Sequence, residues 1–152
     1  MKPTLPLLVW ALLIQAINIA HARIGETEQQ IIARYGKSIK DIPSKGAREK
    51  YGAFVFNGFT IIVVFLDGVS QAESYSKDRD GEFSNDEIAA LLKANAPAAS
   101  WKLKASTPPA KLQWEAKIDK FTVFAIYSKK PSGYSLIFGT TDYAKYMVNS
   151  LE

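Results

Sequence analysis

Two dipeptides that favour tight β-hairpin turns, Asn57-Gly58 and Asp67-Gly68, interrupt one apolar stretch from Ala53 to Ser76. Asn-Gly and Asp-Gly readily supply the positive φ angles that two-residue hairpin turns require. The segments around them are rich in β-branched and aromatic residues, which fit a pleated sheet. The stretch therefore predicts a three-stranded antiparallel meander, with strands over Tyr51–Phe56, Phe59–Leu66 and Val69–Ser76.

The middle segment of this meander, FTIIVVFL, is apolar on both of its predicted faces. A sheet that is covered on one side and wet on the other should alternate apolar and polar residues. We therefore expect one of two arrangements for the second face. In the first, a loop, the last helix or a second copy of the chain covers this face. In the second, the face stays exposed and binds a partner, because an exposed apolar patch of more than a few hundred Å² usually marks an interface.

The first 22 residues have the pattern of a secretory signal peptide. Lys2 forms a short positive region, an apolar run follows from Leu5 to Ala20, and Ala20-His21-Ala22 is a small-x-small cleavage signal. The alternative is a retained membrane anchor, although the run is short for a span of about 20 apolar residues. We expect cleavage before Arg23, which leaves residues 23–152 as a single α+β domain.

The composition excludes several kinds of site. The chain has no cysteine, and its one histidine, His21, lies in the predicted signal peptide. Zinc sites built from Cys and His, cysteine nucleophiles and His-based catalytic triads are therefore excluded from the mature chain, as is a lipoprotein-type thioether anchor. The formal net charge is +4 without a long run of like charges, which gives no argument for nucleic acid.

Helix signals lie on both sides of the meander. Thr27 and Gln30 form a capping-box pattern and Gly36 suits a C-cap, while Ser84 and Glu87 form a second capping box in front of a helix that Pro97 ends. The remaining predicted elements are a polar loop over Lys37–Lys50, strands over Trp101–Lys104, Leu112–Ile118, Phe121–Tyr127 and Tyr134–Gly139, and a final helix over Asp142–Leu151 with Tyr143, Tyr146 and Met147 on one face.

Residues Ser76 to Glu87 also match part of an EF-hand-type calcium loop. The residues that match the calcium-loop pattern, at loop positions three, five, six, eight, nine and twelve, are Asp78, Asp80, Gly81, Phe83, Ser84 and Glu87. However, Ser76 stands where the first Asp is expected, and a strand precedes the loop in place of a helix. The capping box from Ser84 to Glu87 needs fewer assumptions, so we expect no metal site here.

Three other possible functions are each suggested by one kind of side chain: carboxylates, aromatic rings or basic groups. A carboxylate-based hydrolase would draw on Glu73, Glu115, Asp119 or Asp142, but nothing in the sequence pairs them. A small-ligand or carbohydrate binder would use the flat rings of Trp101, Trp114, Tyr127, Tyr134, Tyr143 and Tyr146, most of which a core explains equally well. The basic residues of the Lys37–Lys50 loop could meet an anionic partner, but such solvated loops are ordinary.

Part of the chain resembles a known family. The segment Gly25–Ile31, GETEQQI, followed by Gly36, is similar to the G-x-T-x-x-Q-V…G-x-P helix signature of the BamE-type (SmpA/OmlA) outer-membrane assembly lipoproteins, and Phe65–Val69, FLDGV, is similar to their hairpin. The superfamily includes the β-lactamase inhibitor protein, which this chain resembles in having two tandem units. The resemblance covers about residues 23–76. It departs from the family at Ser38, where Pro is frequent, and in lacking the lipidated Cys.

This resemblance implies a two-layer helix-on-sheet fold in the cell envelope and a protein-binding role without catalytic residues. Together with the helix-plus-meander order of both halves, it predicts an α+β fold in which helices pack on an antiparallel meander sheet, as two tandem units over about residues 23–78 and 84–152. We expect a periplasmic or secreted, non-catalytic module that binds another envelope protein, without cofactor, nucleic acid or membrane-embedded segment.

Overall fold

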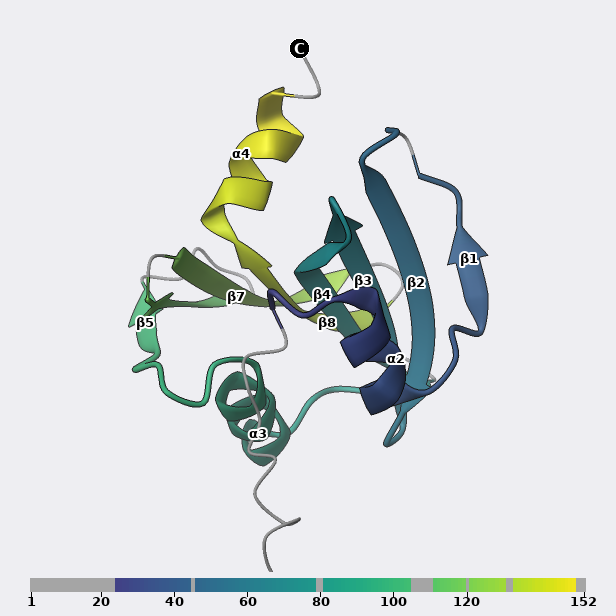
Figure 1. Cartoon of the computed structure of the whole chain (residues 1–152). Coiled ribbons are helices and arrows are strands. Elements are labelled where there is room, and N and C mark those ends of the chain that lie inside the picture. The colour runs from purple at the N-terminus through teal and green to yellow at the C-terminus, as the bar shows by residue number, and fades with distance from the viewer. Residues whose placement is uncertain are drawn as a thin grey trace, which may run out of the picture.

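Eight antiparallel strands form one continuous, strongly twisted sheet in the order β1-β2-β3-β4-β8-β7-β6-β5 (Figure 1). The computed structural model describes residues 24–44, 46–78, 81–104, 111–119, 121–130 and 133–149. Strands account for 50% of these residues and helices for 26%. The helices are α2 (Glu28–Tyr35), α3 (Asn85–Asn95) and α4 (Thr141–Asn149), and the strands are β1 (Lys40–Ile42), β2 (Glu49–Phe56), β3 (Phe59–Leu66), β4 (Val69–Lys77), β5 (Lys102–Lys104), β6 (Lys111–Ile118), β7 (Phe121–Lys130) and β8 (Gly133–Thr140).

The predicted two-layer arrangement of helices on a meander, built from two tandem units, is wrong. β4 pairs with β8 in register from Ala72↔Gly139 to Ser76↔Ser135, and this pairing joins all the strands into one sheet. The three helices of the described residues are short, with 8, 11 and 9 residues, and do not cover all eight strands. In addition, α4 lies on the opposite side of the sheet from α2 and α3 (Figure 1).

The two predicted hairpin turns are confirmed. Asn57 and Gly58 have φ angles of 50° and 79°, and Asp67 and Gly68 have φ angles of 53° and 81°. Both turns thus use two consecutive residues with positive φ, the geometry that continues the twist of the flanking strands. The three strands that these turns connect have nearly the predicted bounds.

Both predicted capping boxes are also present. The Thr27 side chain accepts from the Gln30 backbone N–H, the Ser84 side chain accepts from that of Glu87, and each N3 side chain bonds back to the cap. The polar loop predicted over Lys37–Lys50 is wrong in part, because it contains the short edge strand β1. The final helix starts close to its predicted position, and the last residues of its predicted range lie outside the described residues.

The main core lies between the sheet and the helices α2 and α3. These two helices contribute Ile31, Tyr35, Ile88, Leu91 and Leu92, and the facing sheet residues include Phe54, Ile61, Val63, Phe65, Tyr75, Leu136 and Phe138. A polar group is enclosed in this core: the Tyr35 hydroxyl lies 2.9 Å from Glu73 Oε2 and donates to it, and the Tyr75 hydroxyl donates to the same oxygen. This buried network connects α2 to the centre of the sheet.

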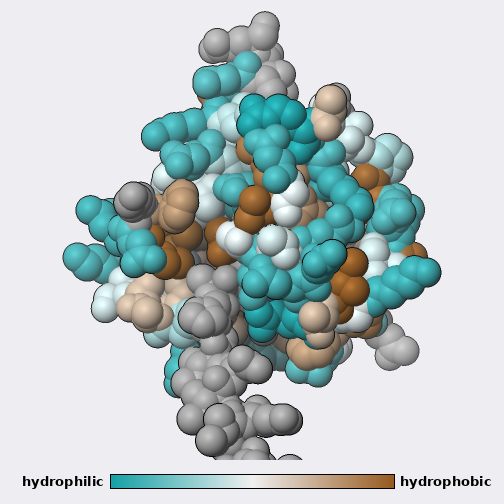
Figure 2. Space-filling model, in the orientation of Figure 1, coloured by the Kyte–Doolittle hydropathy of each residue, from teal (hydrophilic) through white to brown (hydrophobic). Residues whose placement is uncertain are grey.

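On the side of the molecule seen in Figure 2, apolar atoms form separate small groups among hydrophilic ones. In the part of the chain that the structure describes, no helix is both long and apolar enough to cross a membrane. The predicted signal peptide lies outside the described residues.

Candidate interaction face

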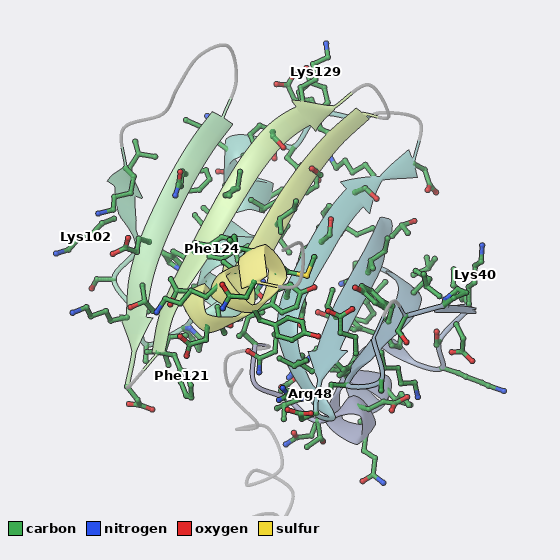
Figure 3. All side chains as sticks on the ribbon, turned by 90° about the horizontal axis from the view of Figure 1, so that it is seen from above. Lys40, Arg48, Lys102, Phe121, Phe124 and Lys129 are labelled. Atoms are coloured by element: carbon green, nitrogen blue, oxygen red, sulfur yellow. The ribbon has the colours of Figure 1, made fainter. Side chains whose placement is uncertain are left out.

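One face of the sheet points away from α2 and α3, and we call it the open face. Along each strand, side chains point alternately to the core and away from it. The open face consists of the side chains that point away from the core. At its centre lie Thr60, Ile62 and Val64 of β3, Ser74 and Ser76 of β4, Ser135 and Ile137 of β8, and Phe124, Ile126 and Ser128 of β7. Figure 3 looks onto this face, with α4 rising toward the viewer.

The strand register arranges the open face in rows that cross the sheet. One row is apolar except for a serine and runs through Ile62, Ser74, Ile137 and Ile126. The next row carries hydroxyl groups and runs through Thr60, Ser76, Ser135 and Ser128. Ile62 is 36% exposed, and Ile126 and Ile137 are partly buried. The doubly apolar segment FTIIVVFL is thus explained: its odd residues enter the core, and its even residues form the centre of the open face.

A phenylalanine lies flat on this face where a neighbouring strand has no side chain. Phe124 of β7 is directly opposite Gly139 of β8. A Cβ atom added at Gly139 would lie only 2.7 Å from Phe124 Cζ, so the ring occupies the space above the glycine. The next residue in the same row, Ala72 of β4, is also small. The ring therefore sits low on the sheet, near the point where the chain leaves β8 for α4 (Figure 3).

Helix α4 covers only one end of the open face. None of its residues is buried. Tyr143 is hydrogen-bonded to Tyr51 of β2, whose hydroxyl also donates to Glu49 Oε2 at 2.8 Å. Burial raises the pKa of Tyr51 well above its ordinary value, and the hydrogen bonds to Glu49 and Tyr143 raise it further. The base of α4 is thus fixed by tyrosine hydroxyls, and the predicted covering of the second face by the last helix is partial.

The outermost strands carry lysines on the open face. The register places Lys40 of β1 on this side at one edge of the sheet, and Lys102 and Lys104 of β5 with Lys117 of the adjacent β6 on the same side at the other edge. Figure 3 shows Lys40 and Lys102 at opposite edges of the sheet. Asp41 and Leu103, which alternate with these lysines along β1 and β5, point to the helix side.

The four carboxylates considered for catalysis do not form a pair. Glu73 is fully buried on the helix side of the sheet, whereas Glu115 lies on the open face of β6 and pairs with Lys104. Asp119 occupies the β6–β7 turn with a φ of 49°, and Asp142 is in the first turn of α4. Glu73 and Glu115 thus point to opposite faces of the sheet, and Asp119 and Asp142 come from a turn and from a helix.

The aromatic rings considered for carbohydrate binding separate into two groups. Trp101, Trp114, Tyr127 and Tyr134 lie on the helix side, buried or partly buried at the edge of the core. Trp101 Nε1–H donates to the Leu92 carbonyl at 2.8 Å. Tyr143 and Tyr146 stack on each other on α4. The described rings therefore do not form one exposed row.

The residues of the calcium-loop pattern have other partners. Glu87 Oε2 accepts from the Ser84 backbone N–H and from Lys77 Nζ, each at 2.7 Å. Phe83 is buried in the core, and Asp80 lies outside the described residues. Among the side chains that the structure describes, no group of three acidic or histidine residues is arranged to hold a metal ion.

Comparisons with protein families, with characterised proteins and with solved structures found no match for this chain. The resemblance to the BamE-type lipoproteins therefore stays a prediction that rests on the residues quoted for it.

Proposed function

We propose that this protein is an exported, non-catalytic module that binds another protein of the cell envelope through its open face. The observation that carries the proposal is the partly exposed apolar row of Ile62, Ile137 and Ile126 on the open face, opposite the side of the sheet where α2 and α3 cover the main core. Burying such a row against a partner contributes roughly 25 cal/mol for each Å² of apolar surface removed from water.

The dimensions of the open face favour a protein over a small ligand. Eight strands spaced about 4.8 Å apart extend roughly 34 Å across the sheet. A typical protein interface buries about 800 Å² on each partner, and a face of this width provides an area of that order. Hydroxyl groups such as those of Thr60 and Ser76 can supply the hydrogen bonds that such an interface needs.

The N-terminal segment indicates where in the cell the mature chain acts. The positive residue, apolar run and small-x-small signal of residues 1–22 match a secretory signal peptide. The lack of cysteine after this segment leaves no residue for a lipoprotein-type anchor. We therefore place the mature chain in the periplasm or outside the cell.

The experiment compares two isoleucines of equal exposure on opposite sides of the sheet. Ile62 on the open face is 36% exposed and Ile32 on α2 is 38% exposed. Tagged full-length chain, produced in its own host, is cross-linked in the cell envelope and purified, as are the variants Ile62→Thr and Ile32→Thr. We expect a protein that is recovered with the wild type and with Ile32→Thr and that is lost with Ile62→Thr.

Threonine keeps the β-branch that suits a strand, so Ile62→Thr should fold, which circular dichroism checks. Recovery of the same proteins with both variants would contradict binding through the open face. Recovery of none, from a host that exports the chain, would contradict the proposed function as a whole.

A further inference from the structure

The lysines of the outermost strands point to one side of the sheet only. On β1, Lys40 points to the open face and Asp41 to the helix side. On β5, Lys102 and Lys104 point to the open face and Leu103 to the helix side. Lysines on an edge strand also prevent sheets from pairing edge to edge. That role does not require a particular face, so it does not account for this one-sided placement.

These lysines exceed the carboxylates that could neutralise them. Among the described strand side chains on the open face, Glu115 is the one carboxylate that is not buried; its side chain is 41% exposed and lies 3.6 Å from Lys104 Nζ. Glu49 is buried and accepts from Tyr51. Within the described part of the chain, Lys40, Lys102 and Lys117 make no ion pair. The open face therefore has a neutral, apolar centre and a basic rim.

We propose that the surface that docks on the open face is acidic: its carboxylates pair with the lysine rim, and an apolar side chain packs on Phe124, Ile126 and Ile137. This inference rests on the proposed function and adds the chemistry of the partner. Complementary charge guides association and selects between partners. A second copy of this chain would bring lysines against lysines, with Glu115 as the opposing exposed charge on each side, so self-association through this face is disfavoured.

The test uses random peptides displayed on phage, selected on the purified full chain at physiological ionic strength. Two charge-reversed variants accompany the wild type. Lys102→Glu with Lys104→Glu changes the rim. Lys37→Glu with Lys93→Glu makes the same change in net charge at two exposed lysines, one after α2 and one on α3. Because all four positions are exposed, each variant should keep its fold, which thermal unfolding checks.

We expect the wild type and the Lys37/Lys93 variant to enrich peptides that combine Asp or Glu with an aromatic or aliphatic residue. The same peptides should bind the Lys102/Lys104 variant about tenfold more weakly, since reversing two rim charges turns attraction into repulsion. Equal losses in both charge-reversed variants would overturn the inference, because the effect would then depend on net charge alone.

The Ile62→Thr variant separates this inference from the function on which it rests. Enriched peptides that lack acidic residues but depend on Ile62 would overturn the acidic partner and keep the open face as a binding site. Peptides that are indifferent to Ile62, or no enrichment at all, would count against the open face itself.

Discussion

Replacing Gly139 with alanine tests whether the ring of Phe124 really lies over β8. The new Cβ would be 2.7 Å from Phe124 Cζ and 3.1 Å from Cε1. Ordinary contacts between carbon atoms are about 3.5–4.0 Å long, so the ring must withdraw by roughly 1 Å. Over-packing of this kind costs about 1–3 kcal/mol. Because the ring is at the surface and can tilt outward, we expect about 1–2 kcal/mol.

The same substitution should have the opposite sign when the ring is absent. In a Phe124→Ala background nothing opposes the Cβ, and alanine stabilises a strand interior by roughly 0.5–1 kcal/mol relative to glycine. The two substitutions should therefore be coupled by about 2 kcal/mol. For a domain of this size, 1 kcal/mol corresponds to a shift in Tm of about 3–5 °C, which is easily measured.

The assay is urea unfolding of the four proteins of the double-mutant cycle, followed by circular dichroism, with thermal unfolding as a second measure. Gly46→Ala is the control, since a Cβ there would lie 3.5 Å from the Tyr146 hydroxyl oxygen, an ordinary contact, and should change the free energy of unfolding by less than about 0.5 kcal/mol. An equal cost of Gly139→Ala with and without the ring would refute the reasoning.

Three further predictions concern the polar groups that hold the helices. Ser84→Ala removes the N-cap of α3 and should cost about 1 kcal/mol in urea unfolding. The hydrogen bond from Lys77, with that from the Ser84 backbone, lowers the pKa of Glu87 below its ordinary value of 4.5. This carboxylate thus stabilises the fold above about pH 4.5 and loses its contribution as the pH falls further, so the acid-induced fall in Tm should be smaller in Glu87→Gln than in the wild type. Tyr35→Phe removes a buried hydroxyl that donates to Glu73 and should cost about 1–3 kcal/mol; a cost near zero would show that this hydrogen bond does not hold α2 to the sheet.

Local features of this fold could be predicted because short segments determine them. Asn57-Gly58 and Asp67-Gly68 form the hairpin turns through their own φ preferences, and the capping boxes at Thr27 and Ser84 need only residues three positions away. The apolar even residues of β3, such as Ile62, also indicated that the second face needed an explanation. These even residues lie on the open face, which we propose binds a protein.

The overall arrangement could not be predicted in the same way. The pairing of Ala72 with Gly139 depends on two strands that are distant in the sequence, and no local pattern specifies their register. β1 is only three residues long within a polar segment, below the length at which alternation is a signal. The apolar side of α4 was visible in Tyr143 and Tyr146, but nothing in the sequence said which face of the sheet it would meet.

The place of β8 at the centre of the sheet bears on when the protein can fold. β8 is the last strand among the described residues, and next to its pairing with β4 the Thr140 hydroxyl donates to Gln71 across 69 residues. Closing such a long loop is slow compared with forming a hairpin. The strands before α3 can pair locally, but the inner edge of β4 stays bare until the C-terminal strand arrives. If the chain crosses a membrane N-terminus first, as the proposed signal peptide requires, β4 and β8 can pair only after residues 133–140 have crossed, so the strand order keeps the two halves of the sheet apart until then.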